Sequence, residues 1–181
     1  RALIAALMHY NHIKVPDSIE LAKTYLSFLL HMQREDGRFH NIMGFDRQFK
    51  DKIGSEDCMG HSLWACGFTL SRNISEEMKP VAKEIFDICF PYSRLFKSPR
   101  AKALTILGLH HYQSAFPQDE NVELNINEIS SDLITQYNIE SEKKWRWFES
   151  YLTYANSRLP QSMFAAYLST RNSEYLKIGL E

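Results

Sequence analysis

An alternation of two kinds of helical segment constrains the fold of this 181-residue chain more than any other feature. Glycine and proline are scarce, hairpin-type turn dipeptides are absent, and no stretch sustains a strand-like alternation of polar and apolar residues. Segments rich in small apolar residues begin near positions 56, 99 and 157, and residues 2–13 form an earlier fourth. Amphipathic segments lie between them. The sequence therefore predicts an all-α protein.

This alternation also predicts how the helices are layered. A helix that is apolar on every side is buried, whereas an amphipathic helix covers a core with one face. Repeated helical pairs bury their faces against neighbouring pairs, so one layer becomes inner and the other outer. If the array curves, the inner helices all begin at one rim. We expect the following residues to share that rim: Glu56, Asp57, Pro99, Arg100, Asn156 and Arg158.

Capping signals predict where the helices begin. Ser55 and Ser98 precede two of the small-residue segments as N-cap residues, and Pro99 occupies a first helical position, where its missing N–H costs nothing. Ser75-Glu76-Glu77 predicts a further helix start. The spacing of a capping box predicts two more starts, at Asp17 with Glu20 and at Asn125 with Glu128.

Residues 34–55 form a long polar connector between two of the predicted helices. Connections longer than about 12–15 residues in a compact domain are usually either functional or disordered. The aromatic and aliphatic content of this one favours order, with Phe39 and Phe45 as the two anchors.

Composition excludes several classes of function. A formal net charge of -1 offers no basic surface for nucleic acid, and no run reaches the roughly 18 apolar residues that span a bilayer. Three cysteines without CxxC spacing argue against a disulfide framework and a structural zinc cluster, and favour a reducing compartment. Neither a phosphate-binding glycine-rich loop nor a GxSxG elbow is present. We expect a cytoplasmic protein without membrane or nucleic-acid partners.

The two ends of the chain indicate an excised domain. Arg1 leads directly into an apolar helical pattern without a capping residue, and the chain closes on Gly179-Leu180-Glu181 soon after another helix has begun. A terminal Leu-Glu is a common expression-vector remnant. We therefore expect one domain, residues 1–179, from a longer polypeptide, with residues 180–181 as a vector-derived scar.

The stretch WRWFESYLTYANSRLPQSMFAAYL, residues 145–168, is the densest cluster of functional residue types. Aromatic rings with one carboxylate and one guanidinium, just before a helix start, suit a pocket for a neutral polyhydroxylated ligand. The alternative is that the rings plug the end of a helical domain, since aromatic side chains bury the most apolar surface. Because this stretch is the third long approach to an inner helix, a pocket is the favoured interpretation.

Carboxylates in these segments raise the possibility of glycoside hydrolysis, which needs two carboxyl groups. Asp57, in a first helical turn, and Glu149, among tryptophans whose apolar surroundings favour a protonated acid, are the predicted catalytic pair. A helix-capping role for Asp57 and an ion pair of Glu149 with Arg146 or Arg158 are the alternatives. Asp36 is a third carboxylate and a possible ligand contact, and the alternative for Asp36-Gly37 is turn chemistry.

Further residues are predicted to bind a sugar. Stacking platforms are expected at Trp64, Trp147 and Tyr154, and hydroxyl-binding groups at His61, Asn156 and Arg158. His61 has the alternative of a hydrogen-bonded core residue, and His110-His111 is explained by the favourable field at a helix C-terminus. A zinc site of Asp57, Cys58 and His61 is disfavoured, because consecutive helical residues point about 100° apart. No metal or cofactor is expected.

Four motif blocks, in this order, carry a resemblance to a known family: DGRFHN (36–41), SEDCMGHSLWA (55–65), SPRAKALTILGL (98–109) and WRWFESYLTYANSRLPQSMFAAY (145–167). Over about residues 1–170 the chain resembles the α/α-toroid, six-hairpin-like domains of bacterial carbohydrate-active proteins. It is similar to the helical region that follows, or is encoded beside, bacterial glycosyltransferases and mannoside phosphorylases. The resemblance implies a cytoplasmic, sugar-linked function but does not identify a pair of catalytic residues in this sequence.

The resemblance further implies an α/α-toroid-like array of helical hairpins with inner and outer layers. A complete toroid needs more chain than this, so the ring would be incomplete. We expect a carbohydrate-processing or carbohydrate-binding domain with its pocket formed by residues 36–41, 56–64 and 145–158. If enzymatic, it would be glycosyltransferase-associated or glycoside hydrolase-like. The alternative is a non-catalytic module that docks onto a glycosyltransferase domain of the same parent chain.

Overall fold

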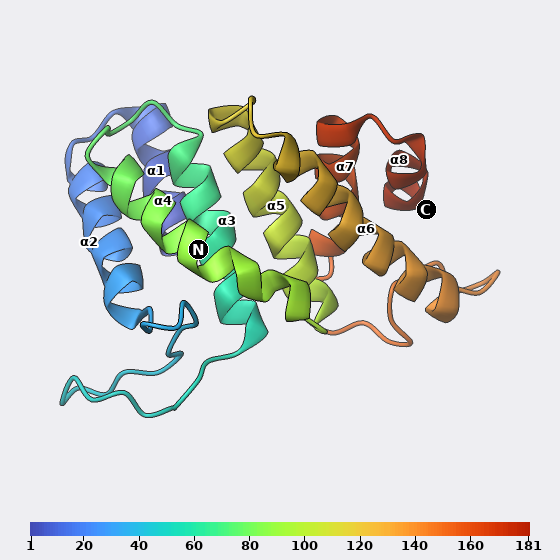
Figure 1. Ribbon diagram of the computed structural model, residues 1–181, viewed down its shortest axis with the longest axis horizontal. Coiled ribbons are helices and arrows are strands. Elements are labelled where there is room, and N and C mark those ends of the chain that lie inside the picture. Colours follow the sequence, from blue (N-terminus) through green and yellow to red (C-terminus); the bar gives the residue numbers. More distant parts are fainter.

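The computed structural model describes all 181 residues, and its regular structure is entirely helical (Figure 1), which confirms the predicted all-α class. The elements in chain order are α1 (Ala2–Ile13), α2 (Asp17–Met32), α3 (Glu56–Leu70), α4 (Met78–Cys89), the 3-10 helix η1 (Phe90–Leu95), α5 (Pro99–Ala115), α6 (Glu120–Glu140), α7 (Arg158–Thr170) and α8 (Ser173–Leu180). No helix combines the length and the apolar character needed to cross a membrane.

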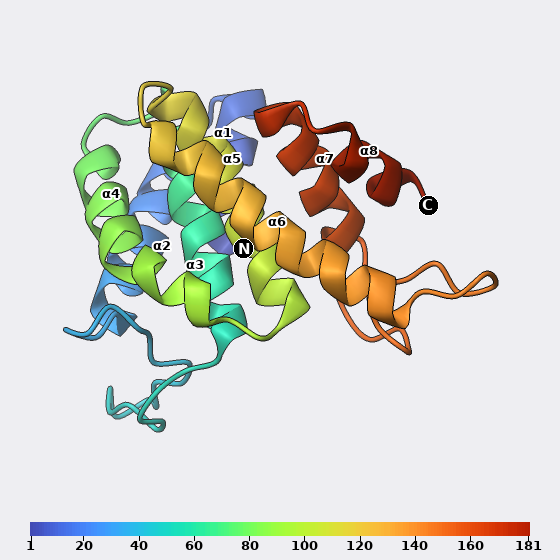
Figure 2. The same ribbon diagram turned by 45° about the vertical axis from the view of Figure 1, so that its right-hand side comes forward.

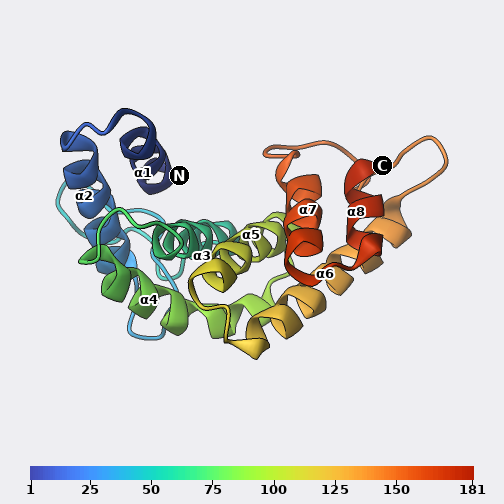
Figure 3. The same cartoon turned by 90° about the horizontal axis from the view of Figure 1, so that it is seen from above.

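The helices form an arc with two sides. Seen from above, α1, α3, α5 and α7 follow the concave side, and α2, α4 and α6 lie behind them on the convex side (Figure 3). The connectors that lead into α3, α5 and α7 all lie at the same end of the molecule (Figures 1 and 2). We call this end the rim. The three helices therefore begin side by side, as the alternation of segments predicts.

Helices α3 and α5 pack with their backbones almost in contact. A Cβ placed on Gly67 would come within 2.2 Å of the Gly108 carbonyl oxygen, and one on Gly108 within 2.7 Å of the Leu63 carbonyl oxygen. Only glycine fits at so close a crossing. Residues from all sides of α3 are buried, as predicted, whereas α1 leaves Met8 47% exposed. The centre of the arc is thus densely packed, and its N-terminal helix presents an open face.

Two of the predicted helix starts are confirmed by their cap bonds. The Ser55 side chain accepts a hydrogen bond from the Cys58 backbone N–H at 3.3 Å, and Ser98 accepts one from the Ala101 N–H at 3.3 Å. Both serines thereby satisfy a backbone donor that the helix itself leaves free. The predicted start near Ser75 is early, because α4 begins at Met78.

The two predicted capping boxes are wrong. Asp17 is already the first residue of α2, and no side chain caps that helix. Asn125 lies inside α6, whose cap is Asp119. The Asn125 side chain instead accepts a hydrogen bond from Arg94 at 2.9 Å and donates to the Asn121 carbonyl oxygen at 2.7 Å. A tertiary partner has therefore stabilised an asparagine inside a helix, a position that local propensity disfavours.

The 34–55 connector is tied to the start of α3. Phe39 is buried with 1% exposure, as predicted, but Phe45 is fully exposed and anchors nothing. Phe49 takes its place by stacking on the His40 ring at 3.9 Å. The Asn41 side chain accepts from the Ser55 backbone N–H at 3.1 Å, which fixes the end of the connector at the N-cap of α3.

The cysteines and the last residues complete the fold. Cys58, Cys66 and Cys89 are all unpaired, and burial raises the pKa of the Cys89 thiol to about 12. Leu180 belongs to α8, and the Glu181 carboxylate accepts a hydrogen bond from the Tyr137 hydroxyl at 2.5 Å. Glu181 therefore contacts α6, whereas the Leu180 side chain is 72% exposed.

Candidate functional site

At the rim, two carboxylates of α3 reach the start of α5. Glu56 accepts hydrogen bonds from the backbone N–H groups of Lys97 and Ser98, at 2.8 and 2.7 Å. Asp57 accepts one from the Ser98 hydroxyl at 3.0 Å and another from the Tyr154 hydroxyl, which belongs to the connector before α7. Asp57 therefore joins three segments that are distant in the sequence, and Ser55, not Asp57, caps α3.

Arg100, in the first turn of α5, organises the connector before α7. Its side chain is only 5% exposed, and its Nη1 lies 2.8 Å from the Glu149 carboxylate. Its Nε donates to the Tyr154 carbonyl oxygen at 2.5 Å, and its Nη2 donates to the Asn156 side chain at 3.1 Å and to the Thr153 hydroxyl. The guanidinium also lies 4.8 Å from the centroid of the Tyr154 ring.

We refer to these residues together as the rim cluster: Glu56, Asp57, Ser98, Arg100, Thr153, Glu149, Tyr154 and Asn156. The sequence placed most of these residues at the rim, Arg100 included, but did not predict that Arg100 pairs with Glu149. Glu149 pairs with Arg100 rather than with Arg146 or Arg158, and Arg146 lies near Glu181 instead, at 3.6 Å. The ion pair replaces the apolar surroundings expected for Glu149.

The rim cluster satisfies most of its own polar groups, and the exception is the Glu149 Oε2, which is buried without a partner. Both Asp57 oxygens and one Glu149 oxygen accept hydrogen bonds from side chains of this chain. The bond to Asp57 raises the pKa of the Tyr154 hydroxyl. Neither carboxylate lines any of the five principal cavities. The arrangement therefore fastens the connector to the rim.

Two other predicted residues lie apart from the rim cluster. Asp36 pairs with Arg38 at 2.7 Å and with Arg34 at 3.1 Å, and Arg38 in particular holds the pKa of that carboxyl far below its usual range. Trp147 packs edge-on against Phe148, with ring centroids 5.7 Å apart, and its buried Nε1 has no partner. Asp36 therefore has the structural role in a turn that was its alternative interpretation, and both of its ion pairs are with arginines of the same loop.

A cavity of about 390 Å³ opens along the concave side, and we call it the concave groove. It is lined by Arg1, Ile4, Ala5, Met8, Trp64, Phe68, His111, Arg158 and Gln161. The Arg158 guanidinium lies 4.6 Å from the Trp64 ring centroid, and its Nη1 donates to the Gln161 side chain. The Trp64 Nε1 is buried without a partner. Trp64 and Arg158 are therefore the predicted ligand contacts that meet in one cavity.

Two histidines border this groove as neutral rings. His61 Nε2 accepts from Arg1 Nη2 at 2.9 Å, so the ring proton sits on Nδ1, which is buried without a partner. Burial, followed by the charge of Arg1, lowers the pKa of His61 to about 4. Burial likewise lowers the pKa of His111 to about 4. His111 is thus no cation at neutral pH, which corrects the helix-terminus explanation. It packs edge-on against Phe68 at 5.0 Å.

Sequence reasoning predicted only two of the nine residues that line the groove, Trp64 and Arg158, because it placed the pocket at the helix starts. The groove runs along the helices instead, so its residues recur at helical spacing. Trp64 and Phe68 are four apart, and Arg158 and Gln161 are three apart, which puts each pair on one helix face. That spacing is the signal that could have joined Phe68 and Gln161 to the residues already predicted.

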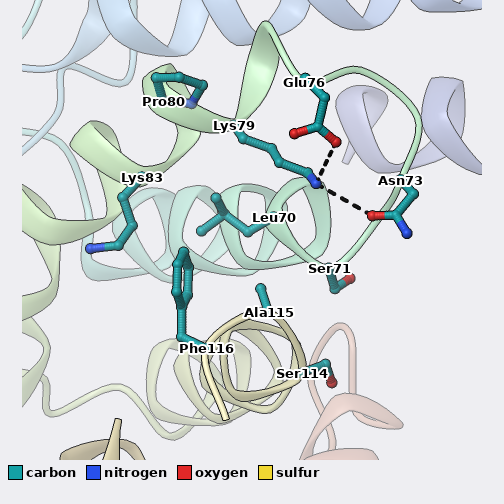
Figure 4. A pocket seen from close by; sticks show the side chains of 10 residues that line it. All are labelled: Leu70, Ser71, Asn73, Glu76, Lys79, Pro80, Lys83, Ser114, Ala115 and Phe116. Atoms are coloured by element: carbon teal, nitrogen blue, oxygen red, sulfur yellow. Dashed lines mark hydrogen bonds and ion pairs between the residues drawn. The ribbon is translucent and has the colours of Figure 1, made fainter. Parts of the chain in front are cut away.

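The largest cavity, about 580 Å³, lies at the other end of the molecule, where α3 and α5 finish (Figure 4). Its polar groups already have partners: Lys79 donates to Glu76 at 2.8 Å and to Asn73 at 3.3 Å (Figure 4). Lys83 pairs with Asp87 at 2.5 Å. None of the residues predicted from the sequence lines it. We therefore take the concave groove, not the largest cavity, as the candidate site.

No group of three or more His, Cys, Asp or Glu side chains is arranged to hold a metal ion. The groove instead combines guanidinium, indole, imidazole and amide groups. No protein-family model matches this sequence, and a search of curated proteins returns no match.

Proposed function

We propose that this chain is a carbohydrate-binding domain and that its ligand occupies the concave groove. The arc of helices would then be part of an α/α-toroid-like array, with α1, α3, α5 and α7 as the inner layer of an open ring. One observation carries the proposal: the groove is lined by Trp64, whose buried Nε1 has no partner, beside a second aromatic ring and two guanidinium groups. Its volume of about 390 Å³ lies within the range usual for small-molecule pockets.

The lining suits the two surfaces of a sugar. A sugar ring offers apolar C–H faces and a belt of hydroxyl groups that both donate and accept hydrogen bonds. Trp64 and Phe68, which we call the aromatic floor, would contact the apolar C–H faces together with Met8. Arg158 and Gln161 would supply donors and an acceptor for the hydroxyl groups. The unpartnered Trp64 Nε1 supports the proposal, since a buried donor without a partner is costly and a ligand hydroxyl would satisfy it.

Binding is favoured over hydrolysis by the state of the two predicted catalytic carboxylates. Glycoside hydrolysis needs an acid and a base or nucleophile, both facing the scissile bond. Asp57 is bonded to Ser98 and Tyr154, and Glu149 to Arg100, within the rim cluster. Their present partners would have to move before either group could act on a substrate. We therefore assign recognition, and not bond cleavage, to the domain.

Isothermal titration with mannose- and glucose-type oligosaccharides tests the proposal. We expect binding, weakened about three- to tenfold in Trp64→Phe, because the variant loses one hydrogen-bond donor and part of the ring. Trp147→Phe is the matched control, since that indole also has a buried Nε1 without a partner but lies outside the groove. Absence of binding across the panel, or equal loss in both variants, would overturn the assignment.

A further inference from the structure

The concave groove is positively charged, although the chain as a whole is not. The formal net charge of the protein is -1, yet the groove is lined by Arg1 and Arg158 and by no Asp or Glu. Neither arginine forms an ion pair: Arg1 donates to the neutral His61 ring, and Arg158 donates to the Gln161 amide. The groove therefore holds two cations whose side-chain hydrogen-bond partners are both uncharged.

The two guanidinium groups are close enough to affect one another. Burial lowers the pKa of Arg158, and the charge of Arg1 lowers it further. Arg158 is half-buried and Arg1 is exposed, so water screens the repulsion between the two charges only in part. Asp57 forms no ion pair with either arginine and accepts hydrogen bonds from Ser98 and Tyr154 instead, although its charge acts on the His61 ring. An external anion would relieve this repulsion.

A third arginine, Arg72, adds positive charge beside the groove. The Arg72 guanidinium lies 4.4 Å from the centroid of the Phe68 ring, and its buried Nε has no partner. Arg72 forms no ion pair, so a third unneutralised cation lies beside a residue that lines the groove. Several positive charges around one cavity with low-dielectric walls concentrate the electrostatic potential inside it.

We propose that the concave groove recognises a negatively charged group on its ligand, so that the ligand is an acidic sugar bearing a carboxylate or a phosphate. This inference rests on the proposed function, since it specifies the class of carbohydrate. Both groups match the donor geometry of guanidinium, which binds carboxylate and phosphate oxygens through paired N–H donors. Arg1 and Arg158 hold the charge, and the aromatic floor holds the ring.

Three monosaccharides that differ only at one carbon test the inference: glucose, glucuronate and glucose 6-phosphate, titrated into the full chain. We expect at least one acidic sugar to bind about tenfold or more tightly than glucose, equivalent to about 1.4 kcal/mol. Glucuronate and glucose 6-phosphate separate the carboxylate from the phosphate. Arg158→Gln should abolish the preference, whereas Lys144→Gln, which removes an exposed charge elsewhere, should not. Thermal unfolding of each variant establishes that it is folded, and Arg1→Gln serves as the second variant.

The outcomes separate this inference from the function on which it rests. Equal binding of all three sugars, weakened in Trp64→Phe but not in Arg158→Gln, overturns the acidic preference and leaves carbohydrate binding intact. Sodium sulfate tests the opposite case, in which the groove binds an anion but does not recognise a sugar. If sulfate binds as tightly as the acidic sugars, and Arg158→Gln abolishes both, the anion site stands and the carbohydrate assignment fails. No binding of any probe overturns both.

Discussion

The rim cluster and the concave groove are built from similar residues but differ in whether the chain supplies a counterion for their arginines. Arg100 in the rim cluster has a carboxylate counterion, two backbone or side-chain carbonyl acceptors and a hydroxyl. Arg158 in the groove has an amide and an indole ring. A dense set of polar and aromatic residues can therefore serve to bind the chain to itself. The ligand site is better identified by charges that the fold leaves without a counterion.

The largest effect is expected from breaking the rim cluster at its centre. Arg100→Met should lower the free energy of unfolding by about 3 kcal/mol, because the Glu149 carboxylate, whose side chain is 17% exposed, loses its counterion. Chemical denaturation monitored by circular dichroism measures the change. The double variant Arg100→Met/Glu149→Gln should recover part of the loss. Equal stability of the single variant and the wild type would contradict a structural role for this pair.

A smaller effect is expected where the rim cluster is more exposed. Tyr154→Phe removes the hydroxyl that donates to Asp57 but keeps the ring beside Arg100. Because Tyr154 is 54% exposed, water replaces much of the lost bond, and we expect a loss of about 1 kcal/mol in the free energy of unfolding. Sugar binding in the groove should remain unchanged. A variant that binds less tightly yet unfolds normally would show that the two regions are coupled.

The smallest effect near neutral pH is expected from the histidines that border the groove. The unfolded chain takes up protons at His61 and His111 near pH 6.5, whereas the folded chain does so only near pH 4. The unfolded state binds more protons between these values, so stability should fall as the pH decreases from about 6.5 to about 4. Unfolding curves across this range should lose part of that slope in His61→Gln/His111→Gln.

The stability that the rim cluster contributes should change at alkaline pH. The folded state raises the pKa of Tyr154 above the ordinary value of 10, so the unfolded chain releases that proton first. Stability should therefore fall as the pH rises above about 10, and Tyr154→Phe should lack this contribution. Separate acid and alkaline windows would sharpen the distinction between the two regions.

Local signals predicted the framework of the fold well. Scarce glycine and proline, with apolar residues at helical spacing, were enough for the all-α class, and Ser55 and Ser98 marked two helix starts correctly. These signals succeed because a helix and its cap depend on residues only a few positions apart. The alternation of segments also placed the starts of α3, α5 and α7 at one end, because each pair reverses the chain direction.

Contacts between distant segments required the tertiary structure. The partner of Glu149 was sought among nearby arginines, yet Arg100 lies 49 residues away and reaches it only because α5 begins beside the connector. Asn125 was assigned to a cap, yet Arg94 accounts for its place inside α6. In each case a long-range hydrogen bond outweighs a local preference of about 1 kcal/mol, and no nearby residue reports it.

The sequence by itself determined the helices, their two kinds and the rim at which three of them begin. Only the tertiary structure decided which polar residues are satisfied and which are not. That division depends on curvature: the arc turns one face of each inner helix toward the same groove, where Arg1 and Arg158 meet across 157 positions of the chain. Whether a charge finds a counterion is a property of three-dimensional distance, and residue spacing along the sequence does not contain it.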